Sequence, residues 1–333
     1  MTWTRARTLY APAGWYEKEV VVTSVSDYLK IIEAISKKND KLITVWRGMP
    51  DARRSLTSTL FETLATQQKD GPWQLPTERD LFNAERNAIL TARSQWRIEV
   101  RNPLLFFAEL QHLGAPTRLL DVTRNPLVAL WFACQPESGR DAQLTNKVAT
   151  ATAQEVDDGR VIGFGFADNQ TLEEKFVKSL GMNDQFAWPS DWGSDKQTKL
   201  WFPPVETHIR IFAQNAGFIL AGLPTFPPGT SKTSAYRRLN RKETWSNREV
   251  LAGTNVHYNV GRVSMDENGN YKVRQSRAQG TIPAWTVRIP SACKGKIIDE
   301  LARVYGLTVA SLFPGVEGLA TSARKSKLHL FRF

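Results

Sequence analysis

The chain has 333 residues, of which 41% are hydrophobic and 23% are charged, a composition typical of soluble globular proteins. It contains no apolar run long enough for a transmembrane helix and no apolar signal-peptide core at the N-terminus, so we expect a cytoplasmic protein without a membrane partner. The two cysteines are too few for a disulfide framework or a zinc site. The formal net charge of +11 favours a polyanionic partner, above all nucleic acid; the alternative is a basic surface with no role in binding.

The N-terminal part of the chain predicts a helix over 27–38 and a β-branched strand over 42–46. This strand leads into the motif Trp46-Arg47-Gly48. Glycine at a strand end lets the backbone approach a ligand closely, and Arg47 could present its planar guanidinium to a phosphate. The alternative is an ordinary arginine held by a core carboxylate.

A dense motif at residues 111–133 combines turn, strand and helix signals. Three helices are predicted before it, over 60–66, 78–96 and 104–110. The motif itself predicts a strand over 117–122 and then a helix capped by Thr123 or Asn125, with Pro126 in its first turn. Backbone N–H groups at such a strand-to-helix junction can bind an anion. The polar side chains gathered there are His112, Thr117, Arg118, Asp121, Thr123 and Asn125. Alternatively, these side chains only cap the helix and satisfy the backbone.

The C-terminal half predicts further strands and helices. They are a strand over 160–167, a helix over 172–180, two strands over 208–214 and 217–220, a hairpin within 253–271, a strand over 285–289 and a helix over 296–305. Gln214 lies at the bend between the paired strands. Glu267-Asn268-Gly269-Asn270 is typical of a hairpin turn.

A basic segment at 229–253 mixes cationic and aromatic residues. Cationic groups contact phosphates, and aromatic faces stack on unpaired bases. The candidate nucleic-acid contacts are Lys232, Tyr236, Arg237, Arg238, Arg241, Lys242, Trp245 and Arg248. The alternative is a solvated basic loop.

Three separated motifs resemble the FRG domain family. The first is Trp46-Arg47-Gly48, with Trp46 where the family usually has Phe or Tyr. The second and most specific is QHLGAPTRLLDVT at 111–123, continued by NPLVALWFA at 125–133. The third consists of Arg210, Gln214, Gly217 and Phe218. The resemblance implies an N-terminal extension at 1–24, an FRG domain at 25–322 with a basic insertion at about 229–280, and a C-terminal tail at 323–333.

The order of these motifs is similar to the plan of ADP-ribosyltransferases. That plan implies an α+β fold with a split, mainly antiparallel core sheet and flanking helices, NAD as the substrate, and no metal. The residues implied as catalytic are Arg47, Thr117, Asp121 and Gln214. Those implied to bind NAD are Trp46, Arg47, Gly48, His112, Arg118, Thr123, Asn125 and Arg210. Gln214 departs from the plan, because many such transferases have a glutamate there and a neutral amide can only position a group.

We therefore expect an NAD-dependent ADP-ribosyltransferase that modifies nucleic acid, with RNA favoured over DNA, and that serves as a toxin or phage-defence effector. An antitoxin or a chaperone is a further candidate partner. The alternatives are a non-catalytic module that binds a nucleotide or nucleic acid, and an NAD hydrolase. A metal or serine hydrolase is disfavoured, because the four histidines lack metal-ligand spacing and no nucleophile elbow is present.

Overall fold

Most of the chain folds around one central sheet. In the computed structural model, the residues described are 19–52, 54, 56–67, 73–74, 76, 78–136, 157–172, 198–204, 209–220, 256, 258–275, 282–316 and 318–319. The strands of the sheet are β1 (Val20–Val21), β2 (Ile43–Met49), β5 (Leu120–Thr123), β6 (Gly159–Phe166), β7 (Lys199–Trp201), β8 (Ala216–Leu220), β9 (Tyr258–Val260) and β12 (Ile282–Ile289). Their order is β1-β12-β6-β2-β5-β8-β7, with β9 beside β12. Within the described residues, β1 and β9 pair in parallel with β12 and the other pairs are antiparallel, which confirms a mainly antiparallel sheet.

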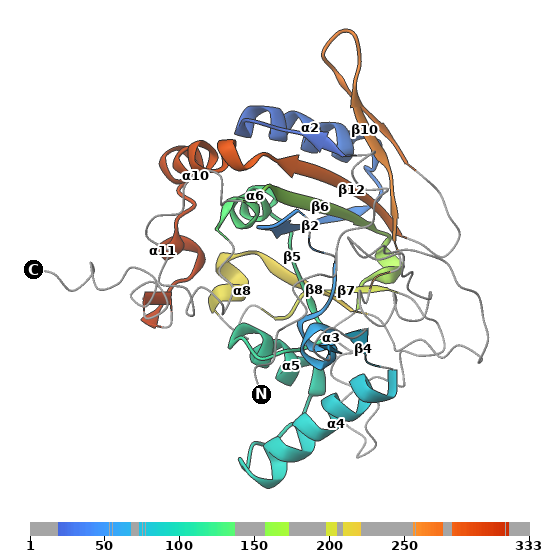
Figure 1. Cartoon of the computed structure of the whole chain (residues 1–333), viewed down its shortest axis with the longest axis vertical. Helices are drawn as coiled ribbons and strands as arrows, with labels where there is room; N and C mark the ends of the chain where they lie inside the picture. Colours follow the sequence, from blue (N-terminus) through green and yellow to red (C-terminus); the bar gives the residue numbers. More distant parts are fainter. Residues whose placement is uncertain are drawn as a thin grey trace, which may run out of the picture.

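Helices flank this sheet, so the fold is mixed α/β. They are α2 (Val25–Lys38), α3 (Thr59–Leu64), α4 (Glu78–Ser94), α5 (Pro103–His112), α6 (Pro126–Cys134), α8 (Ile209–Ala213), α10 (Ser291–Tyr305) and α11 (Val309–Leu312), with a 3-10 turn η2 (Asp168–Gln170). Two small ribbons lie outside the sheet: β3 (Thr66–Gln67) with β4 (Trp73–Gln74), and β10 (Arg262–Met265) with β11 (Tyr271–Arg274). Figure 1 shows α2, α6 and α10 near the β12 side of the sheet, and α3, α4 and α5 beyond β8.

Apolar faces of these helices build the core in the way that their sequence periodicity predicts. Helix α2 starts at Ser24, whose side chain accepts from the Asp27 N–H, and its buried face includes Tyr28, Ile31 and Ile35. That face belongs to a cluster shared with α6, α10 and Trp46. A second cluster lies around β6 and β2, and a third joins α4 and α5 to β7 and β8. The core thus fixes β2 and β5, which carry the first two sequence motifs.

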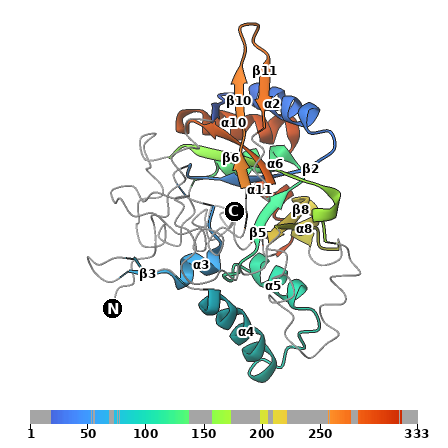
Figure 2. The ribbon, with the colours of Figure 1, turned by 90° about the vertical axis from the view of Figure 1, so that its right-hand side faces the viewer.

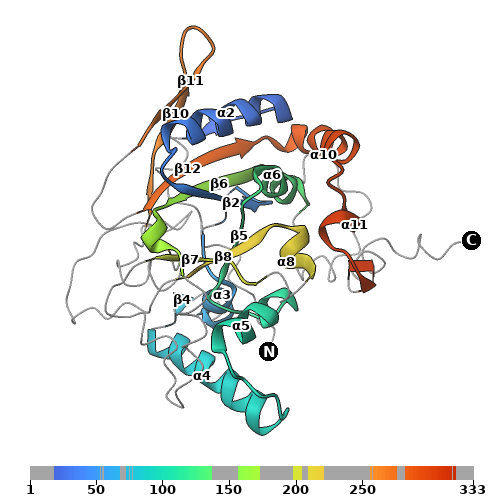
Figure 3. The same cartoon turned by 180° about the vertical axis from the view of Figure 1, so that it is seen from behind.

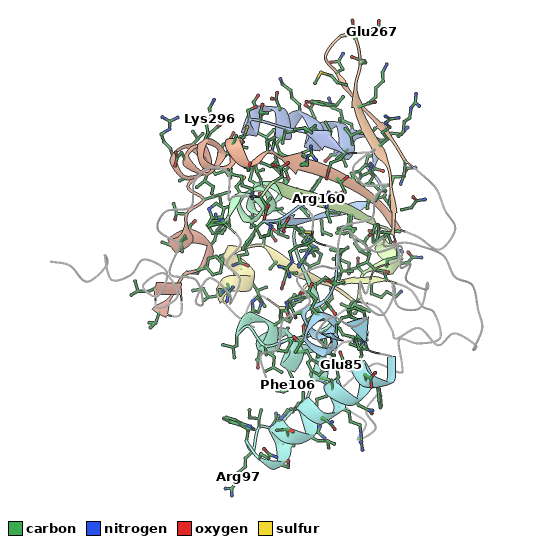
Figure 4. The ribbon with its side chains drawn as sticks, viewed as in Figure 1. Glu85, Arg97, Phe106, Arg160, Glu267 and Lys296 are labelled. Carbon is green, nitrogen blue, oxygen red and sulfur yellow. The ribbon has the colours of Figure 1, made fainter. Side chains whose placement is uncertain are left out.

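A buried ion pair links strand β6 to neighbouring segments of the chain. Arg160 on β6 is fully buried, and its Nε lies 2.5 Å from an oxygen of the buried Glu19 carboxylate. The same guanidinium donates to the Ala52 carbonyl, which follows β2. Figure 4 shows Arg160 in the interior of the molecule. The pair therefore joins the segment before β1 to β6 and to the loop after β2.

The prediction of a strand over 208–214 is wrong, because residues 209–213 form helix α8. The Gln214 N–H bonds to the Arg210 carbonyl at 3.0 Å, and the chain leaves the helix at Asn215, which has φ 46°. Alternating Ile209 and Ile211 suggested a strand, but five residues are too few for periodicity to distinguish the two. Most of the helix predicted over 172–180 lies outside the described residues.

The predicted insertion at about 229–280 contains β9 and the β10–β11 ribbon. Strand β9 pairs with β12 and so extends the central sheet. The ribbon stands out beyond α2, as seen from behind in Figure 3. These elements are therefore ordered parts of the same structure, and the boundaries of the insertion stay a prediction.

Helix α6 lies so close to β2 that only glycine fits between them. A Cβ at Gly48 would lie 1.9 Å from the Ala129 carbonyl oxygen and 2.8 Å from the Phe132 Cβ. The sequence predicted a close approach at Gly48, but by a ligand. The group that approaches this side of Gly48 is the backbone of the helix.

We predict that Gly48→Ala lowers the free energy of unfolding by about 1–3 kcal/mol or more, because the methyl group must push α6 away from β2. The control is Gly295→Ala in α10, where an added Cβ meets nothing within 4 Å. That change should stabilise the protein by up to about 1 kcal/mol, since alanine favours a helix. Urea denaturation of both variants measures the difference. Equal stability of the two variants would contradict the close packing at Gly48.

Candidate functional site

The first two motifs meet where β2 and β5 touch. These two strands are paired at one position, where Trp46 lies opposite Thr123. By contrast, β2 pairs with β6 along its whole length, and β5 pairs with β8 along its whole length. Figure 2 shows β5 leading away from β2 toward β8. We call this place the β2–β5 junction; Arg47 and Asp121 flank it.

Arg47 bridges the junction to Asp121. Its Nη1 donates to the Asp121 carbonyl oxygen at 2.7 Å and lies 3.8 Å from the carboxylate Oδ2. The Arg47 side chain is 22% exposed and that of Asp121 is 51% exposed. One edge of the pair therefore faces solvent, where a ligand could reach both groups.

Burial lowers the pKa of the Arg47 guanidinium, and the nearby charge of Asp121 opposes that shift. The positive charge of Arg54 lowers this pKa further, and the negative charge of Glu62 raises it. Because the ordinary pKa of arginine lies far above neutral pH, Arg47 stays a cation at neutral pH. Its buried Nε has no hydrogen-bond partner among the described residues. The part of the Arg47 side chain that is exposed, 22% of its surface, is where N–H donors could meet an anionic or hydroxyl-bearing ligand.

Gln111 connects Asp121 to Thr117. Its Nε2 donates to the Asp121 Oδ2 at 2.9 Å, and its Oε1 accepts from the Thr117 hydroxyl at 2.7 Å. Thr117 is buried, and its backbone N–H donates to the Thr59 hydroxyl at the start of α3. A continuous hydrogen-bonded chain therefore orients the carboxylate that faces Arg47. Gln111 belongs to the motif, but sequence reasoning assigned it no role.

A second carboxylate lies near Arg47. Glu62 on α3 is held by Arg54, with Nη2 and Oε2 3.0 Å apart, and by the Thr57 hydroxyl. Its side chain is 23% exposed. Sequence reasoning missed Glu62 and Arg54, because no local pattern links residues 54–62 to the strand that carries Arg47.

Gln214 takes part in a different, buried set of contacts. Its side-chain Nε2 donates to the Leu312 carbonyl at 2.9 Å, and its backbone carbonyl accepts from the Thr123 hydroxyl at 2.6 Å. The Thr123 hydroxyl also accepts from the Asn125 N–H at 2.9 Å. The Gln214 side-chain amide thus ties the end of α8 to α11, and the Gln214 backbone is connected to the β2–β5 junction through Thr123.

Arg210 and His112 belong to the same side of the molecule as Gln214. The Arg210 Nη1 donates to the His112 carbonyl at 2.7 Å, and the guanidinium lies over the Phe313 ring, 4.6 Å from its centroid. The His112 ring is buried edge-on against Phe218, with centroids 5.7 Å apart. These contacts join the end of α5 to α8 and α11.

The remaining predicted residues have structural partners. Trp46 is buried against Gly163, and Asn125 caps α6 by accepting from the Leu127 N–H at 3.0 Å. Arg118 is buried, and its Nε lies 2.8 Å from the buried carboxylate of Glu85 on α4. Glu85 is labelled in Figure 4. This pair anchors α4 to the motif, which favours a structural role for Arg118 over its predicted contact with NAD.

The predicted nucleic-acid contacts at 232–248 lie outside the described residues. In the part of the chain that the structure describes, no group of His, Cys, Asp and Glu could hold a metal ion. No helix there could cross a bilayer. The structure has a hollow of about 600 Å³ along α10, which contains none of the predicted residues; it is lined by Gly295, Lys296, Asp299, Glu300 and Arg303.

Comparison with known proteins supports the assignment of the first two motifs. Residues 43–142 match the family model of the FRG domain, a range that contains the first two motifs and the whole Arg47–Asp121–Gln111–Thr117 chain. No curated protein and no solved structure matches the chain.

We predict that Glu85→Ala destabilises the protein by about 3–5 kcal/mol, because it removes the carboxylate beside the buried Arg118 guanidinium. The control is Glu99→Ala, which removes the carboxylate of the exposed Glu99–Arg101 pair and should leave stability unchanged. Chemical denaturation measures both. If the two variants unfold at the same denaturant concentration, the Glu85–Arg118 pair does not anchor α4.

We also predict that Thr117→Val destabilises the protein by about 1–3 kcal/mol, because Gln111 and the Leu119 N–H each lose a hydrogen-bond partner. Thr117→Ser keeps the hydroxyl and should cost less. Combining Thr117→Val with Gln111→Met should give less than the sum of the single effects, since both changes break the same bond. Strictly additive effects in urea denaturation would contradict a connected chain.

Proposed function

Since the chain belongs to the FRG domain family, we propose that it is an NAD-dependent ADP-ribosyltransferase that modifies nucleic acid, RNA in preference to DNA. NAD is its substrate, and the reaction needs no metal. In this proposal the protein is a toxin or phage-defence effector. Its free thiols, Cys134 and Cys293, fit a reducing cytoplasm.

The observation that carries the proposal is the β2–β5 junction. A sheet joined there by one residue pair consists of two halves, β1-β12-β6-β2 and β5-β8-β7. This arrangement is compatible with the split sheet of ADP-ribosyltransferases. Arg47 and Asp121 supply one cation and one carboxylate on the two sides of the junction. Such a pair suits a dinucleotide, which brings phosphates to one group and a ribose to the other.

The proposed transfer reaction depends on stabilising the positive charge that develops on the ribose of NAD. The glycosidic C–N bond breaks, its electron pair stays on the nicotinamide nitrogen, and positive charge builds up on the ribose. In the proposed site Arg47 holds the pyrophosphate, and the Asp121 carboxylate, oriented by Gln111, stabilises the ribose cation. An oxygen or nitrogen of the acceptor then forms the new bond to the ribose, and its proton passes to a carboxylate. Asp121 and the nearby Glu62 are the candidates for that base.

Gln214 and Thr117 have supporting parts in this proposal. Thr117 fixes Gln111, and Gln214 holds Thr123 through its backbone carbonyl. The Gln214 amide is bound to Leu312 and carries no charge. The carboxylates beside Arg47 therefore supply the negative charge that many transferases place at the third motif.

A non-catalytic module is the second candidate function. The burial of Gln214 favours it, because the third motif then contributes no side chain to the ligand. Such a module would bind the dinucleotide or nucleic acid without consuming NAD. A hydrolase would consume NAD without labelling an acceptor.

We predict that Arg47→Ala and Asp121→Asn each lower NAD consumption and ADP-ribose transfer about 10²–10⁴-fold, because each removes a group that acts on the developing charge. Both variants should fold, since a partly exposed ion pair adds little stability. The matched controls are Arg101→Ala and Glu99→Gln in the exposed Glu99–Arg101 pair, which should keep full activity.

The assay incubates each protein with labelled NAD and with RNA, DNA and protein acceptors, and follows free nicotinamide and labelled acceptor together. Intact NAD and no labelled acceptor with the wild-type protein would rule out the transferase. Nicotinamide release without a labelled acceptor would identify a hydrolase. Wild-type rates in Arg47→Ala and Asp121→Asn would exclude the β2–β5 junction as the site.

A further inference from the structure

The β10–β11 hairpin projects from the body of the protein. Figures 1 and 2 show it extending beyond α2, at the end of the molecule opposite α4. In Figure 4, Glu267 at its tip and Arg97 after α4 lie at opposite ends. The two strands are in antiparallel register, with Arg262 opposite Arg274 and Ser264 opposite Lys272.

The hairpin has one apolar face and one basic face. Val263 is 4% exposed, and Tyr271 and Val273 pack with it against the core cluster that contains α2. Because side chains alternate along a strand, the residues between them point the other way. All of these residues are exposed; we call them the basic face of the hairpin, which consists of Arg262, Ser264, Lys272 and Arg274.

The charges on the basic face repel one another. Arg262 and Arg274 are directly opposite in the register. Like charges in that position destabilise a strand pair. Within the described residues, neither arginine forms an ion pair with a carboxylate. Lys272 lies 3.4 Å from the Asp266 carboxylate but stays 69% exposed. The arrangement therefore destabilises the isolated hairpin and favours the binding of an anionic partner.

The hairpin holds this face rigidly. The Asp266 carboxylate accepts from the backbone N–H groups of Asn268 and Asn270, at 3.0 Å and 2.9 Å, and these bonds help to lower its pKa. Gly269 closes the turn with φ 78°. At the base, a Cβ on Gly261 would lie 2.5 Å from the Arg274 carbonyl oxygen, so the two chain segments are in close contact. A rigid ribbon loses little conformational entropy when it binds.

We propose that the basic face of the hairpin binds the phosphodiester backbone of nucleic acid. Guanidinium groups match phosphate oxygens in geometry, and a row of cations on a two-stranded ribbon can follow successive phosphates or enter a groove. The net charge of +11 gives the whole chain the same preference. This inference rests on the nucleic-acid partner of the proposed function, but not on the transfer reaction. It also assigns contact residues other than those predicted at 232–248.

The test compares Arg262→Gln/Arg274→Gln with wild type and with Arg86→Gln/Arg97→Gln. The control removes two exposed arginines at the opposite end of the molecule. Each protein is titrated into labelled 20-nucleotide single-stranded RNA, single-stranded DNA and duplex DNA at several salt concentrations. Poly-glutamate is the probe for an acidic protein partner.

We expect the hairpin variant to bind RNA about tenfold more weakly, and its salt dependence, the slope of log K against log[salt], to fall by about 1–2, since each phosphate contact contributes about 0.7–0.9 to the slope. Its melting temperature should not fall, because the Arg262–Arg274 repulsion is relieved. The Arg86→Gln/Arg97→Gln control should bind like wild type. The proposal would be overturned if the hairpin variant kept its RNA affinity, or if the control lost as much RNA affinity as the hairpin variant. It would also be overturned if the hairpin variant lost affinity for poly-glutamate but not for RNA. If the hairpin variant loses RNA binding and the wild-type protein does not turn over NAD, the result would support the hairpin surface and contradict the transferase.

Discussion

The contact between Arg47 and Asp121 is the interaction on which the candidate site depends. It spans the β2–β5 junction, where one residue pair joins the two parts of the sheet. A cation that is mostly buried remains there because a backbone carbonyl and two neighbouring carboxylates offset the loss of hydration. The Gln111–Thr117 chain then fixes Asp121 from the other side. A ligand that binds at this junction meets groups whose orientation is already set.

The packing around the junction limits how it can move. Gly48 allows α6 to press on β2 immediately after Arg47, and the buried Glu85–Arg118 pair holds α4 against the segment before β5. Gln214, α8 and α11 cover the end of β5 through Thr123. The two strands of the junction are therefore supported by separate groups of helices, so a small shift between these groups would change the distance between Arg47 and Asp121.

Local patterns predicted most of the fold and part of the site. The cap and apolar face of α2, the proline-started helix α6 and the turn at Gly269 depend on neighbouring residues, so sequence patterns find them. The prediction failed at helix α8, because its five residues are too few to show a helical periodicity. The partners of Arg118, Gln214 and Asp121 could not be predicted, since each contact depends on how distant segments pack. For the same reason Gln111 and Glu62 had no predicted role, whereas the motif containing Arg47 did direct attention to the β2–β5 junction.

The most direct measurement is a crystal structure of the protein with a non-hydrolysable NAD analogue. We predict that the analogue lies at the β2–β5 junction, with a pyrophosphate oxygen about 3 Å from the Arg47 guanidinium and the nicotinamide-bearing ribose next to Asp121. An analogue bound elsewhere, with Arg47 still donating to the Asp121 carbonyl and no ligand between the two strands, would contradict it.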